Sequence, residues 1–249
     1  MSENQVYYRP AGKESKIKRG SKITRDFING FILELNDNLA SPNFLRFLSD
    51  SRVPNERELY GIFVQSILNS CEKEDIGHIA TEFQVGRKNE LGSNTDPKGR
   101  VDLFFHYRSV SFLIEFKVGR VNASENKGIQ QKAQKLWCEA IKQLDDLEIT
   151  TVEKMMKKKI VMLPIILYFH VSRKPQRTTN CENIHDRILD SIKKVDGKDV
   201  SELIPDFDFC SGIDRTATRL RKTHINDEHN NYVYGVSIFA KQINVENPI

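Results

Sequence analysis

The sequence predicts an α/β protein in which a central mixed β-sheet is flanked by helices. Segments with helical apolar spacing alternate with short strand-like runs along the 249 residues. Residues 160–171 are apolar at both alternating positions, as in a strand covered on both faces. The four cysteines form no CxxC pair, so neither a disulfide framework nor a zinc site is needed to explain a stable fold.

Four segments have the spacing of amphipathic helices: residues 26–48, 55–70, 124–147 and 183–195. The first is expected to break at Ser41, which can cap a second helix that begins at Pro42. Asn55 is the expected N-cap of the next helix. The core-facing stripe of that helix consists of Leu59, Tyr60, Phe63 and Ile67.

Strand-like segments cover residues 78–88, two parts of residues 99–120, and residues 160–171 and 232–243. Pro164 interrupts the apolar segment 160–171 and predicts a β-bulge or a position at the edge of the sheet, because proline cannot donate a hydrogen bond to a neighbouring strand. Neither an internal repeat nor a sharp change of composition divides the chain, so residues 26–249 are expected to form a single domain.

The first 25 residues are expected to form a flexible basic arm. Residues 9–25 contain seven Lys or Arg residues and one Glu. Such a segment is either a solvated tail or an arm that contacts the phosphates of a nucleic acid. Its candidate phosphate-contacting residues are Lys16, Lys18, Arg19 and Lys22. The net charge of +4 permits a polyanionic partner but does not require one.

Several function classes find no support in the sequence. No apolar run is long enough to span a membrane, no signal-peptide apolar segment is present, and the separated cysteines fit a reduced compartment, so a cytoplasmic protein without membrane contact is expected. No phosphate-binding glycine motif is present. His224 and His229 are spaced five residues apart, which favours a polar surface loop over a zinc site, and His106 is expected to be satisfied within the core.

Charged side chains interrupt the two strand-like parts of residues 99–120, where Asp102 lies in the first part and Glu115 and Lys117 in the second. A charge among apolar residues costs free energy unless a partner compensates it. A two-residue turn, or a four-residue loop around it, would place Asp102 opposite Glu115 in a hairpin. A three-residue loop would put the two acids on opposite faces.

In the first of these registers the two carboxylates share a face and need a cation between them. Oxygen ligands of this kind suit Mg²⁺ or Mn²⁺. Lys117 lies on the same face as Glu115, since strand side chains alternate. A metal-held water beside an ammonium group is suited to phosphodiester hydrolysis. The alternative is a solvated strand face with a Glu–Lys ion pair, but Phe104 and Leu113 make that face partly apolar.

The segments GRVD, ending at Asp102, and FLIEFK, containing Glu115 and Lys117, resemble the PD-(D/E)XK, or restriction-endonuclease-like, nuclease superfamily. Val101 stands where the family pattern has Pro. The resemblance covers about residues 56–170 and implies an α/β/α core and divalent-metal-dependent cleavage of nucleic acid, most often DNA. It also implies that Asp102, Glu115 and the backbone carbonyl of Phe116 bind the metal, while Lys117 orients or activates the attacking water.

Members of this superfamily often carry further site residues on the helices before and after these strands. In the preceding helix the candidates are Glu56 and Glu58, of which Glu58 is favoured; either could instead be an acid stabilised by the helix dipole. In the following helix Gln143 lies on the apolar side, where its amide needs a partner. Lys132 is a weaker candidate, because an exposed helix lysine explains it equally well.

The sequence thus predicts a metal-dependent endonuclease with DNA as the favoured substrate, of the kind found in restriction or phage-defence systems. Two alternatives stay open: a non-catalytic nucleic-acid-binding or assembly protein that retains the fold, and an enzyme that cleaves RNA. A homodimer is expected, because enzymes that cut both strands commonly pair two active sites and two-fold dimers are the commonest assembly.

Overall fold

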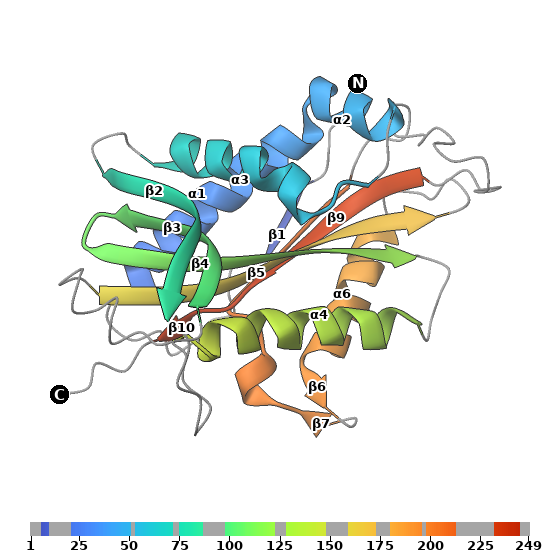
Figure 1. Ribbon diagram of the computed structural model, residues 1–249. Coiled ribbons are helices and arrows are strands. Elements are labelled where there is room, and N and C mark those ends of the chain that lie inside the picture. Colours follow the sequence, from blue (N-terminus) through green and yellow to red (C-terminus); the bar gives the residue numbers. More distant parts are fainter. Residues whose placement is uncertain are drawn as a thin grey trace.

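The computed structural model describes residues 6–9, 21–50, 53–71, 75–86, 98–122, 128–147, 159–172, 180–195, 198–212 and 232–244. In these residues an eight-stranded mixed sheet separates two layers of helices, which confirms the predicted α/β class (Figure 1). The helices are α1 (Ser21–Ala40), α2 (Pro42–Asp50), α3 (Glu56–Ser70), α4 (Gly128–Asp145) and α6 (Asn180–Ile192), with a short 3-10 helix at Ser201–Leu203.

The strands of the main sheet are β1 (Val6–Arg9), β2 (Ile76–Gly86), β3 (Lys98–Tyr107), β4 (Val110–Asn122), β5 (Lys159–Ser172), β8 (Phe207–Gly212), β9 (Tyr232–Ala240) and β10 (Ile243–Asn244). They follow the order β1-β8-β9-β5-β4-β3-β2, and β10 also pairs with β5. Among the described strands, β4 and β5 form the only parallel pair. Strands β6 (Lys194–Val195) and β7 (Lys198–Asp199) form a separate small sheet.

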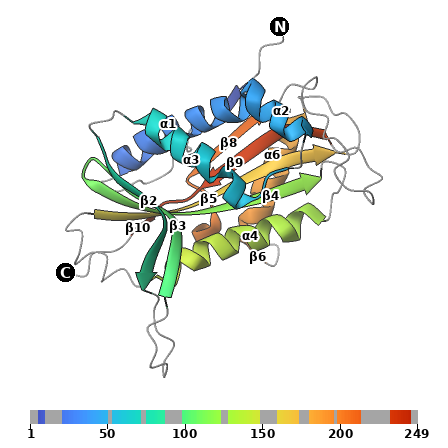
Figure 2. The same cartoon turned by 45° about the horizontal axis from the view of Figure 1, so that its top comes forward.

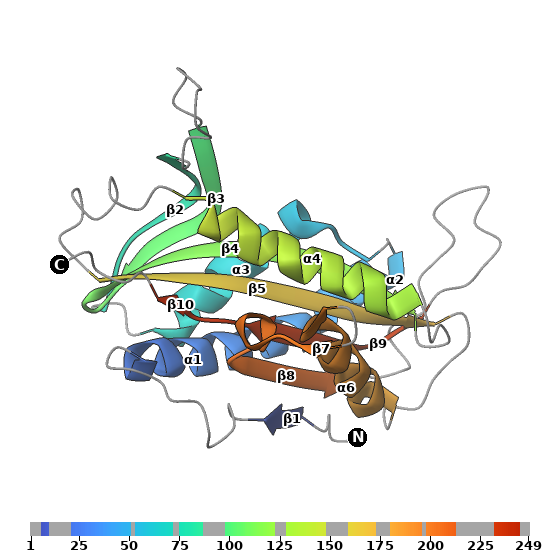
Figure 3. The ribbon, with the colours of Figure 1, turned by 90° about the horizontal axis from the view of Figure 1, so that it is seen from below.

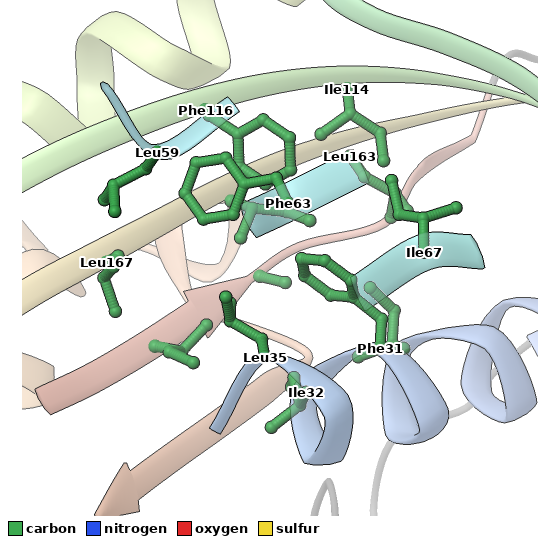
Figure 4. Packing of buried hydrophobic residues seen from close by; sticks show 14 of the residues in the cluster. Phe31, Ile32, Leu35, Leu59, Phe63, Ile67, Ile114, Phe116, Leu163 and Leu167 are labelled. Atoms are coloured by element: carbon green, nitrogen blue, oxygen red, sulfur yellow. The ribbon is translucent and has the colours of Figure 1, made fainter. Parts of the chain in front are cut away.

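Helices α1, α2 and α3 cover one face of the sheet, and α4 and α6 cover the other (Figures 1 and 3). The first layer packs through aromatic side chains. Phe63 of α3 stacks on Phe116 of β4 with ring centroids 4.0 Å apart, and Phe31 of α1 contacts both rings (Figure 4). Aromatic stacking adds to the free energy gained from burial. The contact therefore fixes α3 against the strand that carries Glu115 and Lys117.

The predicted helix boundaries at two caps are confirmed. The chain breaks between α1 and α2 at Ser41, whose Oγ accepts a hydrogen bond from the backbone N–H of Phe44 at 3.3 Å. Asn55 caps α3, and its Oδ1 accepts a hydrogen bond from the N–H of Glu58 at 3.1 Å. Each cap satisfies a backbone donor that the first turn of the helix leaves free.

The expected basic arm of residues 1–25 is partly in regular structure. Val6–Arg9 form β1, which pairs with β8, and α1 begins at Ser21 rather than at residue 26. Lys22 is exposed in the first turn of α1. Lys16, Lys18 and Arg19 lie outside the described residues.

The prediction that Pro164 marks a bulge or an edge is wrong. Pro164 lies inside β5, which has β4 on one side and both β9 and β10 on the other. On this second side β9 pairs with β5 only from Ile165 onward, and β10 pairs at Met162 and Val161. Pro164 therefore falls at the gap between two partner strands, where its missing N–H costs no ladder hydrogen bond.

Strands β2 and β3 leave the sheet at one end. β3 pairs with β4 only over Leu103–Tyr107, whereas it continues to pair with β2 as far as Lys98. Figures 2 and 3 show this two-stranded ribbon bending away from β4. Asp102 lies at the point of divergence. Opposite it in β2, Glu82 adopts a left-handed backbone conformation with φ of 53°, which is uncommon for a non-glycine residue.

Candidate active site

Of the two registers considered for the hairpin, the structure has the one that a two-residue turn sets. Arg108 and Ser109 form a two-residue turn, and the pairs run from Tyr107 with Val110 to Leu103 with Ile114. The turn lacks the Asn-Gly sequence typical of such hairpins. Asp75, just before β2, stabilises this turn instead. The backbone N–H of Arg108 donates to the Asp75 carbonyl and its Nε donates to the Asp75 carboxylate, both at 2.9 Å.

One residue beyond the last regular pair, Asp102 and Glu115 lie at the point where β3 and β4 separate. Asp102 does not continue the regular pairing with β4. Its carboxylate lies against β4 instead, where Oδ2 accepts a hydrogen bond from the backbone N–H of Phe116 at 2.8 Å. The other oxygen, Oδ1, accepts a hydrogen bond from the hydroxyl of Tyr60 in α3. Asp102 is 8% exposed, and these two bonds fix the orientation of its carboxylate.

Glu115 and Lys117 form an ion pair on β4. The Nζ of Lys117 lies 2.6 Å from Oε1 of Glu115 and 3.6 Å from Oε2 of Glu56, at the beginning of α3. Glu115 is almost fully buried, and Lys117 keeps a small exposed fraction. Glu56 and Glu115 thus both pair with Lys117, and the charge of Asp102 acts on the same lysine.

The charges of this cluster do not balance, and the pKa values of its members reflect this. Burial above all, and then the charge of Asp102, raise the pKa of Glu115 from 4.5 to about 7, and Lys117 only partly offsets them. Burial also raises the pKa of Glu56, against the opposing charge of Lys117. Burial lowers the pKa of Lys117, but the neighbouring acids, Glu115 above all, outweigh it and leave that pKa above its usual value. The site therefore holds an excess of negative charge.

The structure corrects the preference for Glu58 over Glu56. The Oε2 of Glu58 accepts a hydrogen bond from the backbone N–H of Asn55 at 2.7 Å, which completes a capping box. Residues two positions apart on a helix point about 200° away from one another, so only one of the two acids can face the strands. That acid is Glu56. The hydrogen bond from Arg120 Nη2 to the carbonyl of Val53, at 2.8 Å, helps to hold the segment before α3 beside β4.

Helix α4 brings Gln143 toward the same part of β4. Because α4 connects two parallel strands, it runs antiparallel to β4, and Leu136 packs against Gly119. Gln143 follows two helical turns later, about 10 Å along the axis, which corresponds to about three residues of strand. Ideal helix and strand geometry therefore places Gln143 over the segment of β4 that contains Glu115 and Lys117.

The amide of Gln143 has an unused acceptor. Its Oε1 is buried and has no hydrogen-bond partner among the described residues. A buried acceptor without a partner costs free energy unless a ligand or a water molecule supplies a donor. Lys132, the weaker candidate in the same helix, is exposed.

Tyr60 is the site residue that the sequence analysis missed, because it was assigned to the apolar stripe of α3. It follows Glu56 by four residues, so both side chains project from one face of the helix. The signal that could have identified it was the combination of a hydroxyl group and this spacing from an acid. Half-buried Tyr60 packs against the core and also reaches Asp102 with its hydroxyl.

The histidines that the structure describes lie elsewhere. His106 bonds to the Oγ of Ser111 at 2.9 Å, in agreement with the expectation of a satisfied core residue, while His224 and His229 lie outside the described residues.

A Ser–His–Asp arrangement is also present away from the site. His185 lies 2.9 Å from the Oγ of Ser237 and 2.8 Å from Oδ2 of Asp208. The same Oγ lies 2.8 Å from Nε2 of His170. Ser237 and His170 are completely buried, which closes this cluster to a substrate and indicates a structural role.

The donor set at Asp102 and Glu115 fits a hard divalent cation. No group of three or more His, Cys, Asp or Glu side chains among the described residues is arranged to hold a metal ion. Magnesium needs fewer, since it keeps several waters and usually takes one or two carboxylates. Two observations agree with this chemistry: the excess negative charge around Glu115, and the unpaired Oε1 of Gln143, which can accept a hydrogen bond from a metal-bound water.

Comparisons of the chain with protein-family models, with curated proteins and with solved structures found no match. A functional assignment therefore rests on the fold and on the geometry of these residues. Within the described part of the chain, no helix has the length and apolar character needed to cross a membrane.

Proposed function

We propose that this protein is a metal-dependent nuclease of the PD-(D/E)XK type that hydrolyses phosphodiester bonds, with DNA as the favoured substrate. One observation carries the proposal. Asp102 lies where β3 diverges from β4. Glu115 and Lys117 lie beside it on β4, and an ion pair of 2.6 Å joins these two residues to one another. Two acids and a lysine on adjacent strands form the constellation by which the chain resembles this class of nuclease.

In this proposal Asp102 and Glu115 bind Mg²⁺ or Mn²⁺ together with the backbone carbonyl of Phe116. When bound, the cation supplies a water of lowered pKa and neutralises charge on the phosphate. The N–H of Phe116 keeps the Asp102 carboxylate in position at no cost in reorganisation. Glu56 adds negative charge at the edge of the site, and Gln143 offers an acceptor that orients a water.

Lys117 has a separate role. Its raised pKa keeps the ammonium group charged, and its ion pair with Glu115 holds the group next to the metal ligands. A positive charge held there orients the attacking water and stabilises the charge that develops on the phosphate in the transition state. Removing Lys117 should therefore affect the chemistry more than the binding of the metal.

The nucleic-acid substrate follows from this chemistry and from the basic character of the chain. The net charge of +4 is compatible with a phosphate-backbone partner, and Lys22 is exposed at the beginning of α1. Lys16, Lys18 and Arg19 are proposed to extend that contact. Base-reading residues are not assigned. A role in restriction or phage defence, a cytoplasmic location and a homodimer belong to the same proposal.

The test is cleavage of supercoiled plasmid, linear DNA and RNA in the presence of Mg²⁺ or of EDTA. We expect cleavage of DNA with Mg²⁺ and none with EDTA. Lys117→Ala should slow it by about 10²- to 10⁴-fold, whereas Lys135→Ala, which removes an exposed lysine of α4, should leave it unchanged. Cleavage of RNA alone would assign the substrate to RNA. Absence of metal-dependent cleavage of all three, with retained binding to DNA, would favour a non-catalytic nucleic-acid-binding protein.

A further inference from the structure

The two oxygens of Asp102 have partners of different kinds. Oδ2 accepts from the backbone N–H of Phe116, which is part of β4 and cannot move without disrupting the strand. Oδ1 accepts from the hydroxyl of Tyr60, a side chain that can rotate. Because Oδ2 is held against the backbone of β4, we place a cation that takes Asp102 as a ligand at Oδ1, where the Tyr60 hydroxyl lies in the absence of metal.

Helix α3 holds Tyr60 in place for this contact. The Phe63 ring stacks on Phe116, the residue whose N–H binds the other oxygen of Asp102. Glu56 meets Lys117 from the same face of the helix, one turn before Tyr60. The backbone of the helix is thus anchored on both sides of Tyr60, and only the Tyr60 side chain needs to move to free Oδ1.

We propose that Tyr60 is a positioning residue that occupies the metal-binding oxygen of Asp102 in the metal-free site and is displaced when a divalent cation binds. Its hydroxyl satisfies a carboxylate that is 8% exposed and that has, among the described residues, no other hydrogen-bond partner on that oxygen. The displacement makes the hydroxyl a competitor of the cation. This inference rests on the proposed metal site at Asp102 and Glu115.

Tyr60→Phe tests the competition, because it removes the hydroxyl and keeps the ring that packs against the core. A hydrogen bond to an ionised acceptor is worth about a tenfold change in an equilibrium constant. We therefore expect Tyr60→Phe to bind Mn²⁺ about tenfold more tightly than the wild type, measured from the electron paramagnetic resonance signal of free Mn²⁺. Tyr107→Phe is the matched control: it lies on the same strand as Asp102, but its ring contacts Phe27 and Arg108 instead of the acids, and it should bind like the wild type.

A second measurement follows the tyrosine directly. Mg²⁺ is transparent in the ultraviolet, so a Mg²⁺-induced difference spectrum in the tyrosine band reports a change around the phenol. We expect such a change in the wild type and in Tyr107→Phe, and none in Tyr60→Phe.

The outcomes separate this inference from the proposed function. Unchanged or weaker Mn²⁺ binding by Tyr60→Phe, with normal binding by the wild type and none by Asp102→Asn, would overturn the role of Tyr60 and leave the metal site intact. Failure of the wild type to bind Mn²⁺, or full binding by Asp102→Asn, would overturn both. Tighter binding together with loss of the spectral change would establish the displacement.

Discussion

The substitution Glu115→Gln should stabilise the metal-free protein above neutral pH and have little effect near pH 5. Burial and the charge of Asp102 hold the pKa of Glu115 at about 7, compared with 4.5 for an ordinary glutamate. Between these two values the unfolded chain has released the proton while the folded chain keeps it. The free energy of unfolding of the wild type therefore falls as the pH rises through this window, and the loss is complete above about pH 7.

The size of the effect follows from the same two pKa values. Each pKa unit corresponds to about 1.4 kcal/mol, so the ionised Glu115 lowers the free energy of unfolding of the wild type by about 3 kcal/mol at pH 8; we call this loss the penalty. Gln carries no charge but can still accept a hydrogen bond from Lys117, so the variant escapes most of this penalty. For a domain of this size 1 kcal/mol changes the Tm by about 2–4 °C. We expect a gain of about 6–12 °C at pH 8.

Thermal unfolding of the wild type and of Glu115→Gln at pH 5 and pH 8, in EDTA, measures this difference. Glu139→Gln serves as the control, because Glu139 is exposed on α4 and should behave alike at both pH values. Mg²⁺ should raise the Tm of the wild type at pH 8 by binding the folded state and leave that of Glu115→Gln nearly unchanged. A lower Tm for Glu115→Gln at pH 8, or an equal gain at both pH values, would refute the assignment of excess negative charge to this site.

Four further substitutions test the division of roles. Lys117→Ala should reduce the cleavage rate by about 10²- to 10⁴-fold in a steady-state assay, while the Mg²⁺-induced rise in Tm is retained. Glu56→Ala should reduce cleavage by roughly 10- to 100-fold. Glu58→Ala should keep its activity and lose about 1 kcal/mol of stability in chemical denaturation, because it removes the capping box. Equal activities of the Glu56 and Glu58 variants would contradict the placement of α3. Ser237→Ala should destabilise the fold by about 1–3 kcal/mol without changing the cleavage rate, because it leaves buried histidine nitrogens without a partner.

The sequence alone predicted the parts of this site that depend on short-range patterns. Alternation along each strand left two registers for β3 and β4, and the two-residue turn of the structure selects the one that brings the acids together. The caps at Ser41 and Asn55 follow from side-chain preferences at single positions. Together with that turn, these local rules bring Asp102, Glu115 and Lys117 to one place.

The remaining features depend on contacts between distant segments. The choice between Glu56 and Glu58 is set by how α3 sits on β4, which no spacing within the helix reveals. The hydroxyl of Tyr60 meets a carboxylate 42 positions later in the chain. Pro164 is tolerated because β9 and β10 leave a gap beside it. β1 and β8 were not recognised, since each is short and pairs with strands that lie elsewhere in the chain: β1 with β8, and β8 with both β1 and β9.

The two edges of the sheet bear on how copies of this chain can associate. An open strand edge offers free N–H and C=O groups to another chain and promotes aggregation. At one edge β1 pairs with β8 and is itself the outermost strand. At the other edge β2 has an irregular register between Ile76 and Ile79 and a left-handed residue at Glu82, and both features distort the straight edge that a second copy would need. If the chain forms the proposed homodimer, we expect the two copies to meet through surfaces other than the β2 edge.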